Sequence, residues 1–323
     1  MRVMGPCAAA VVVLVLALGG CADSAKVDQT ADVFTTATTP SAQPGPAQGA
    51  DDAVTEVVPL SPAAVEKRSI DAAGLRRDYI LSLPEGARQR QKLPLILVFH
   101  GFSEDAATIQ RYSELDKADA LVVYMQGREK AWAPAPYAKT TGEQDLAFVD
   151  AVREQLVNEF SVDTARVFAS GLSNGGGFAA YVGCQRPQDF TAVATVSAAF
   201  YQRVSEGCSA IPIKHIDFHG TADPVINYAG GQRHGTVYES TEEMITEAAE
   251  RNRCNPHPEE NRLSPTVVEQ RWLDCDAGLS HYRIEGGPHV WPGGQMDKSG
   301  TTTEGFATRR QLEFFGVPYQ KLP

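Results

Sequence analysis

The chain has 323 residues and is acidic, because 40 Asp and Glu outnumber 29 Lys and Arg and give a formal net charge of −11. This balance argues against nucleic acid as a partner, since binding to a phosphate backbone depends on clustered Lys and Arg. Apolar residues make up 43% of the chain, which is enough for the core of a globular domain.

The N-terminal segment predicts export. Residues 1–20 carry Arg2 near the start and an apolar run over about residues 8–18, which is typical of a signal peptide and too short to span a membrane. The sequence Leu-Gly-Gly-Cys, ending at Cys21, resembles the lipobox of bacterial lipoproteins, in which the cysteine becomes the mature N-terminus and carries lipid. We therefore expect a lipid on Cys21 that anchors a secreted protein at the extracellular face of the cell membrane. Cleavage as an ordinary signal peptide is the alternative.

Residues 21–64 are rich in Ala, Thr, Pro and Asp, and Phe34 is their one aromatic residue. A segment of this composition cannot bury enough apolar surface to offset the entropy lost on ordering, so it is predicted to be a disordered tether. The remainder, residues 65–323, has the length of one α/β domain.

Strand and helix patterns alternate along this domain. Two strands flank a turn at 71–74 and are expected to pair as an antiparallel hairpin. The run at 93–99 is almost entirely apolar, as in a strand that is buried on both faces of a parallel sheet. The predicted strands are 65–70, 77–83, 93–99, 121–125, 167–169, 191–196, 211–218, 266–273 and 280–284. The predicted helices cover about 103–118, 144–160, 178–182, 240–253 and 304–315.

The stretch 166–180 predicts a strand, a forced turn and the start of a helix. Its centre, 171–175, reads Gly-Leu-Ser-Asn-Gly and matches G-x-S-x-G, the pattern of a nucleophile on a strained turn between strand and helix. Ser173 is therefore the candidate nucleophile, and the backbone N–H of Asn174 is a candidate donor to an oxyanion. A Gly-rich turn that only packs a helix on a strand is the alternative.

The run at 93–99 leads into His-Gly-Phe, where a second oxyanion donor is expected. We assign the backbone N–H of Phe102 to that role, and we expect His100 to brace the loop rather than to act as a base. The long loop 126–142 follows the end of another parallel strand, where α/β sheets bind ligands. Its Trp132 is either a substrate platform or a residue that packs the loop.

A carboxylate and a histidine follow at later strand ends. Asp223 lies on a turn just after the strand 211–218, and His289 lies in a Gly- and Pro-rich loop after the last strand. The order Ser173, Asp223, His289 is the Ser, acid, His order of α/β-hydrolases. Asp217 is the rival acid, but it falls within the strand rather than on a loop.

The domain holds Cys184, Cys208, Cys254 and Cys275. Four cysteines allow three pairings, and export favours disulfides. We favour the two local pairs, Cys184–Cys208 and Cys254–Cys275, because their short loops connect neighbouring elements. Neither a C-x-x-C nor an H-E-x-x-H motif occurs, so we expect no metal and no other cofactor.

Three motifs together carry a family resemblance, namely Gly-Leu-Ser-Asn-Gly-Gly at 171–176, His-Gly-Thr-Ala-Asp-Pro at 219–224 and Gly-Pro-His-Val-Trp-Pro-Gly at 287–293. They resemble the secreted polyhydroxybutyrate depolymerase and feruloyl esterase branch of the α/β-hydrolases. With the lipobox, the whole chain is similar to the LpqC-type esterase lipoproteins.

The resemblance implies an α/β-hydrolase fold, with a mostly parallel central sheet, an N-terminal antiparallel hairpin and helices on both faces. It also implies that Ser173, Asp223 and His289 form a catalytic triad and that Trp291 lies beside the site as a substrate-binding residue. The pair Cys254–Cys275 fits a family position.

The implied activity is that of a lipid-anchored serine esterase that hydrolyses carboxylic esters through an acyl-enzyme. Its substrates would be acyl or aromatic esters, small or linked to a polymer such as polysaccharide. A short-chain polyhydroxyalkanoate depolymerase, a serine peptidase on the same fold and a non-catalytic binding lipoprotein are the alternatives.

Overall fold

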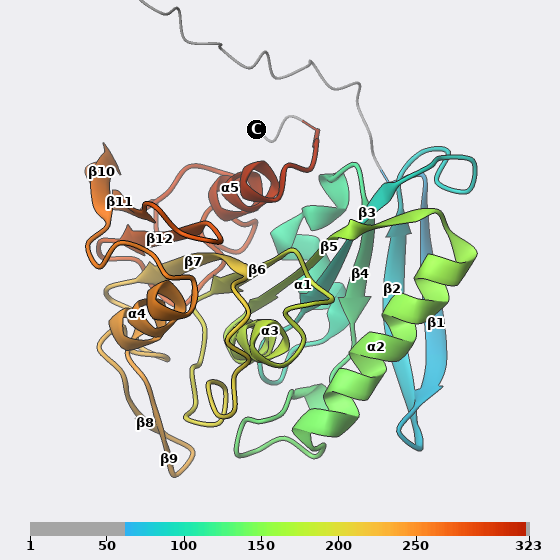
Figure 1. Cartoon of the computed structure of the whole chain (residues 1–323), viewed down its shortest axis with the longest axis horizontal. Coiled ribbons are helices and arrows are strands. Elements are labelled where there is room, and N and C mark those ends of the chain that lie inside the picture. Colours follow the sequence, from blue (N-terminus) through green and yellow to red (C-terminus); the bar gives the residue numbers. More distant parts are fainter. Residues whose placement is uncertain (1–61, 321–323) are drawn as a thin grey trace, which may run out of the picture. The chain divides into compact units, whose positions relative to one another are not determined.

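The computed structural model describes residues 62–320. The predicted signal peptide, Cys21 and most of the predicted tether lie outside this range. Within it, ten strands form one sheet in the order β1-β2-β4-β3-β5-β6-β7-β12-β11-β10, while β8 and β9 pair separately (Figure 1). The strands are β1 (Ala64–Ala72), β2 (Leu75–Leu83), β3 (Leu93–Phe99), β4 (Leu121–Met125), β5 (Val162–Leu172), β6 (Ala192–Val196), β7 (Lys214–Gly220), β8 (Gly231–Arg233), β9 (Thr236–Tyr238), β10 (Glu259–Ser264), β11 (Val267–Trp272) and β12 (Leu279–Ile284).

The middle of the sheet is parallel, from β4 through β3, β5, β6 and β7 to β12. Both edges are antiparallel. Every residue of β3 is buried, as expected for a parallel strand that is covered by helices on both faces. At the N-terminal edge, Ala73 and Gly74 have φ angles of 48° and 74°, which suit the tight turn of a hairpin. The predicted fold class is confirmed.

Helices cover both faces of the sheet. Leu95 and Leu97 pack in one core with α2 and α3, whereas Ile96 and Val98 pack in a second core with α1 and α5. Successive side chains of a strand point to opposite faces, so one apolar run serves both cores. In Figure 1, α2 and α3 lie in front of the sheet. The helices are α1 (Ala106–Ser113), α2 (Gly142–Glu159), α3 (Asn174–Gln185), α4 (Thr241–Arg251) and α5 (Phe306–Phe315).

The helix ends follow their local capping chemistry. Ser240 caps α4 and forms a capping box with Glu243. The first helix is shorter than predicted: α1 ends at Ser113 because Glu114 adopts a left-handed φ of 52°. A short 3-10 turn, Leu115–Lys117, continues the chain.

The sequence pattern misplaced the start of one strand, β7, and missed three others, β8, β9 and β10. β7 begins at Lys214 rather than at Ile211, since Ile211 is 48% exposed and Pro212 has no N–H for the ladder. β10 is almost wholly exposed and lacks apolar alternation. The short β8 and β9 form a hairpin of their own, away from the main sheet.

Both predicted disulfides are present. Cys184–Cys208 links the end of α3 to the segment before β7, and Cys254–Cys275 links the end of α4 to the connection between β11 and β12.

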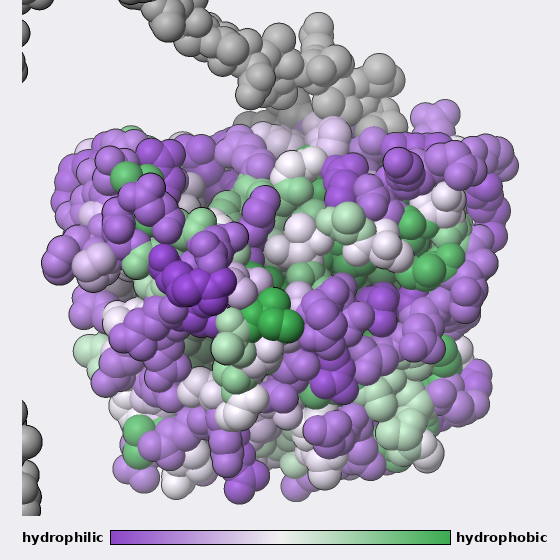
Figure 2. Space-filling model, viewed as in Figure 1, coloured by the Kyte–Doolittle hydropathy of each residue, from purple (hydrophilic) through white to green (hydrophobic). Residues whose placement is uncertain are grey.

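The face of the molecule in Figure 2 is mainly hydrophilic, with apolar residues in small separate patches.

Candidate active site

Ser173 lies on the sharp turn between β5 and α3. Its backbone has φ 56° and ψ −118°, a strained conformation for a residue with a side chain. The flanking glycines are required by close backbone approach. A Cβ at Gly171 would lie 2.2 Å from the carbonyl oxygen of Gly175, and a Cβ at Gly175 would lie 2.1 Å from that of Phe99. The predicted nucleophile turn is therefore present.

Hydrogen bonds fix this turn from two sides. The Ser173 N–H donates to Val196 O at 2.9 Å, and the N–H of Ala199 donates to Ser173 O at 3.0 Å. The side chain of Asn174 accepts from the Trp132 N–H at 2.8 Å and donates to the Trp132 carbonyl at 3.0 Å. The turn is thus tied both to β6 and its exit and to the long loop before α2.

Asp223 and His289 are hydrogen-bonded to one another. The Nδ1–H of His289 donates to Asp223 Oδ2 at 2.7 Å, while Asp223 Oδ1 accepts from the N–H groups of Val225 and Ile226 at 2.8 and 2.9 Å. Burial alone raises the pKa of Asp223, but hydrogen bonds from His219 and His289 outweigh it and hold the pKa well below its usual range. Asp223 is therefore an anion that fixes the tautomer of His289.

Ser173 and His289 line the same cavity, of about 210 Å³. Among residues 62–320, no hydrogen bond joins the serine hydroxyl to the imidazole. Such contacts often tighten only when substrate binds. Because Nδ1 of His289 is occupied by Asp223, Nε2 is the ring nitrogen left for the serine.

The loop that carries Asp223, the acid loop, is held by a hydrogen bond from His219 and by close backbone contact with the loop that carries His289, the histidine loop. His219 Nε2 donates to Ile226 O at 2.9 Å and lies 3.5 Å from Asp223 Oδ2. A Cβ at Gly220 would lie 2.1 Å from the carbonyl oxygen of Gly287, so the backbones of the acid loop and the histidine loop are in direct contact. This close contact brings two segments that are far apart in the sequence to one corner of the site.

The rival acid, Asp217, faces other partners. It is fully buried in β7, where Oδ2 accepts from His281 Nδ1 at 2.8 Å and Oδ1 accepts from the Thr195 hydroxyl. It makes no contact with His289 among the hydrogen bonds of the described residues. The preference for Asp223 therefore agrees with the geometry.

His100 orients the peptide group that carries the predicted oxyanion donor. Its Nδ1–H donates to Gly101 O at 2.7 Å, and its Nε2 accepts from the Gly127 N–H at 2.9 Å. Burial lowers the pKa of His100 to about 4, so the ring is neutral at neutral pH. In a trans peptide the C=O and N–H point in opposite directions, so holding the Gly101 carbonyl also directs the Phe102 N–H. The expected bracing role is confirmed.

The neighbouring N–H groups in this loop are already occupied. The Gly101 N–H donates to Glu104 Oε2 at 3.0 Å, the Ser103 N–H donates to a backbone carbonyl at 2.9 Å, and the Glu104 N–H donates to Gly101 O at 3.2 Å. The N–H groups of Phe102 and Asn174 have no acceptor within the part of the chain described. Both are therefore free to donate to a ligand.

Both tryptophans named as substrate-binding candidates are buried, and Trp132 packs the loop, which is the alternative left open for it. Trp132 is 0% exposed, stacks on Phe178 at 5.0 Å and donates through Nε1 to His100 O at 3.1 Å. Trp291 is 3% exposed and donates through Nε1 to the Thr308 hydroxyl at 2.9 Å. A large indole whose N–H finds a partner is more stable in the core than at an open site.

Other aromatic residues line the cavity beside Ser173. The ring of Tyr137 lies 4.1 Å from Phe102, 4.6 Å from His234 and 6.0 Å from Tyr201. These side chains come from four separate segments, and His234 lies at the turn of the β8–β9 hairpin. Apart from the backbone role given to Phe102, the sequence analysis missed them. The signal in the sequence that could have located the hairpin was the His-Gly pair at its turn, because turns of this kind require residues with positive φ.

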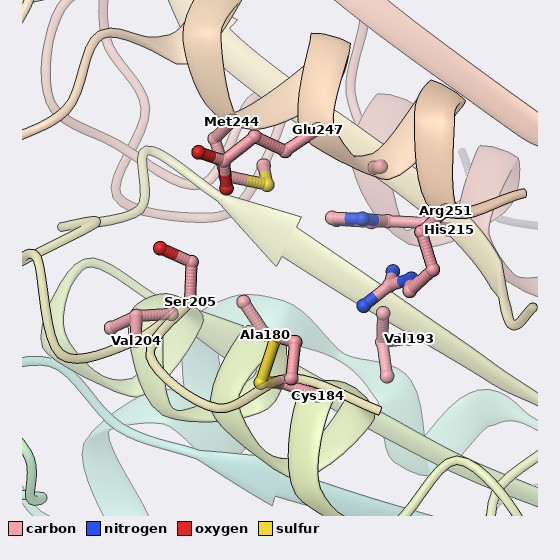
Figure 3. Close-up of a pocket in the computed structure, with 11 residues that line it drawn as sticks. Ala180, Cys184, Val193, Val204, Ser205, His215, Met244, Glu247 and Arg251 are labelled. Carbon is pink, nitrogen blue, oxygen red and sulfur yellow. A yellow bond between two sulfur atoms is a disulfide. The ribbon is translucent and has the colours of Figure 1, made fainter. Parts of the chain in front are cut away.

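A second cavity, of about 80 Å³, lies between α3 and α4 and shares no lining residue with the first. Figure 3 shows Arg251 of α4 beside His215 of β7, with Glu247 farther along the helix. His215 Nδ1 and Arg251 Nε lack hydrogen-bond partners among the described residues. None of the predicted catalytic residues lines this cavity.

The comparisons with known proteins decide the family. Residues 77–230 match the family model described as Esterase PHB depolymerase, where PHB is polyhydroxybutyrate. A protein of Aspergillus niger named as a probable feruloyl esterase C is 32% identical over 219 residues, which are 65% of this chain and 76% of that protein. The chain belongs to this esterase family. The enzyme is a carboxylic ester hydrolase.

Further relatives agree with this assignment. Feruloyl esterase B of Piromyces equi is 27% identical over 238 residues, and the match spans 68% of this chain but only 44% of that longer protein. Among solved structures, an acetyl xylan esterase from Aspergillus awamori superposes with a TM-score of 0.58 at 13% identity, covering 78% of this chain and 99% of that one. The structural likeness supports the α/β-hydrolase fold.

Proposed function

We propose that this ester hydrolase is a serine esterase whose triad is Ser173, Asp223 and His289. The observation that carries the proposal is the 2.7 Å hydrogen bond between His289 and Asp223 at the cavity that Ser173 also lines. The strained turn supports Ser173 as the nucleophile, because that conformation exposes a serine at a helix N-terminus in this fold.

In the proposed reaction, Nε2 of His289 takes the hydroxyl proton of Ser173 while Oγ attacks the ester carbonyl carbon. The oxyanion that forms accepts hydrogen bonds from the N–H groups of Phe102 and Asn174. As the intermediate collapses, the C–O bond to the alcohol breaks and His289 gives its proton to the leaving oxygen. Water then attacks the acyl-enzyme with His289 again as the base, releasing the acid and restoring the serine. Asp223 stabilises the charged imidazole in both halves.

For the substrate, we propose acyl or aromatic carboxylic esters, including aromatic groups carried on polysaccharide. The four aromatic side chains at the cavity support this choice, since planar rings pack well against a flat acyl group. Relatives named as feruloyl esterases support it as well. A soluble, short-chain polyhydroxyalkanoate is the second candidate, because the matching family model describes polyhydroxybutyrate depolymerases.

Three substrates distinguish these candidates. The chain should be assayed with p-nitrophenyl acetate, methyl ferulate and a soluble oligomer of 3-hydroxybutyrate. A kcat/KM for methyl ferulate well above that for the oligomer supports aromatic esters as the substrates. The reverse ranking favours the depolymerase, and turnover of none of the three contradicts the proposed class of substrate.

We also propose export and lipid attachment at Cys21, which lies outside the described residues. The lipobox-like sequence ending at Cys21 is the support for both, and the likeness to LpqC-type lipoproteins stays a prediction. Cys21→Ser should move the enzyme from the membrane fraction to the soluble fraction, because a short apolar segment holds a protein weakly without lipid. A variant that stays with the membrane would contradict the anchor.

A further inference from the structure

Glu104 is a carboxylate at the catalytic cavity that the reaction above does not use. It follows the oxyanion loop, is half-buried, and lines the cavity together with Ser173 and His289. Its position is close to the nucleophile, because a Cβ at Gly101 would lie 3.2 Å from Glu104 Oε2 and 3.5 Å from the Cβ of Ser173. A negative charge at this place would repel the oxyanion that forms during the reaction. Glu104 is therefore expected to have another role at the site.

Two neutral hydrogen-bond donors hold the carboxylate of Glu104. Glu104 Oε2 accepts from the Gly101 N–H at 3.0 Å and from the hydroxyl of Tyr112 at 2.9 Å. No ion pair involves Glu104 within residues 62–320. Its carboxylate is therefore oriented by two hydrogen bonds to the loop and to α1 rather than by a cation.

Tyr112 is a rigid anchor for this carboxylate. It is 2% exposed, and burial, with the Glu104 charge beside it, raises the pKa of the phenol well above its usual value, so the hydroxyl keeps its proton and donates. Its ring packs 6.1 Å from that of Trp291, two residues after His289. Trp291 in turn is held by its hydrogen bond to Thr308. A continuous series of contacts thus joins the histidine loop to the oxyanion loop.

The two peptide groups that flank the Cα of Gly101 are held separately. His100 Nδ1–H holds the carbonyl of the following peptide. The preceding peptide is held at its N–H by Glu104 and at its carbonyl by Trp132 Nε1. Glycine has more backbone freedom than any other residue, so an unheld Gly101 could turn the next N–H away from the site. With both planes held, the Phe102 N–H has one direction.

We propose that Glu104, anchored by Tyr112, is a positioning residue for the oxyanion hole. It occupies the Gly101 N–H, fixes the conformation of that glycine, and leaves the Phe102 N–H as the free donor of the loop. The inference rests on the catalytic roles proposed above for Ser173 and Phe102.

The test compares Glu104→Ala with Glu104→Gln. The amide of Gln keeps an oxygen that accepts from the Gly101 N–H but carries no charge. Because loss of one oxyanion donor lowers kcat by about 10²–10³-fold, a misdirected donor in Glu104→Ala should lower kcat by roughly 10–100-fold with little change in KM. A boronic acid that forms a tetrahedral adduct with the serine should bind the alanine variant more weakly by a similar factor. Glu104→Gln should stay within about 5-fold of wild type in both measurements.

Tyr112→Phe is a second, milder variant that removes only the anchoring hydroxyl. It should lower kcat and boronate affinity in the same direction as Glu104→Ala. The matched control is Glu85→Ala, an exposed carboxylate in the turn after β2, which should behave as wild type.

Two results would overturn the proposal. In one, Glu104→Ala keeps wild-type kcat and boronate affinity. In the other, Glu104→Gln is as impaired as Glu104→Ala, which assigns the effect to charge rather than to position. Labelling of Ser173 by a phosphonate separates this failure from that of the proposed function. A wild-type chain that is neither labelled nor active contradicts the triad, whereas labelled and fully active variants contradict only the role of Glu104.

Discussion

Replacing Arg77 by Leu should destabilise the fold strongly, because it leaves a carboxylate buried without its cation. Arg77 of β2 and Asp145 of α2 form an ion pair of 2.8 Å, with side chains that are 2% and 0% exposed. Asp145 also accepts from the Ala133 N–H at 2.9 Å and from the Thr140 hydroxyl at 2.8 Å. The pair therefore connects the sheet edge to the long loop that holds the nucleophile turn.

Breaking a buried ion pair from one side costs about 3–5 kcal/mol. Two hydrogen bonds to Asp145 remain in Arg77→Leu, so we expect a loss of about 3 kcal/mol in the free energy of unfolding at pH 7. This is a large share of the roughly 5–15 kcal/mol that stabilises a typical domain. Urea unfolding followed by fluorescence measures it. The matched control is Arg76→Leu, since the neighbouring pair Arg76–Asp71 is 65% and 74% exposed and should be worth at most about 1 kcal/mol.

The penalty in Arg77→Leu should also depend on pH. Burial raises the pKa of Asp145 above its usual value even with Arg77 beside it, and removing the cation raises the folded-state pKa further. The folded variant then binds a proton more tightly than the unfolded chain does. Its loss of stability should therefore be largest at pH 7 and shrink as the pH falls toward 4. A loss below about 1 kcal/mol, or one of equal size at both pH values, would refute this reasoning.

The remaining predictions concern the catalytic cavity. Ser173→Ala should lower esterase kcat by roughly 10⁴-fold or more with the thermal melting curve retained, and substantial residual turnover would remove Ser173 from its role. Asp223→Asn should lower kcat by roughly 10⁴-fold because the wrong imidazole tautomer is favoured. Asp217→Asn, assayed in parallel, should retain more activity. The opposite ranking would assign the role of the triad acid to Asp217. His234→Ala should raise the KM for methyl ferulate by roughly 3–10-fold, because an aromatic contact is lost, while the KM for p-nitrophenyl acetate changes little. Equal effects on both esters would show that the β8–β9 hairpin does not select the acyl group.

Local sequence was sufficient wherever covalent geometry or hydrogen bonding within a few residues decides the structure. The pattern around Ser173 predicted the strained turn, because a Cβ at Gly171 would lie 2.2 Å from the carbonyl oxygen of Gly175, so only glycine fits there. The unbroken apolar run of β3 predicted a strand covered on both faces. The capping box at Ser240 fixed the start of α4. The order of Ser173, Asp223 and His289 was enough to propose the triad, since each residue follows a strand end of the same sheet.

Tertiary structure decided what depends on partners far away in the chain. Trp132 and Trp291 lie in predicted loops, where sequence alone left a substrate-binding role open, yet aromatic and hydroxyl partners from α3 and α5 bury them. Arg77 and Asp145 pair across 68 residues, and no local pattern predicts that pairing. The aromatic cavity likewise collects Phe102, Tyr137 and His234 from separate loops. Sequence therefore determines which groups lie at the strand ends, because that follows from local periodicity, whereas only packing determines which of them remain exposed to a substrate.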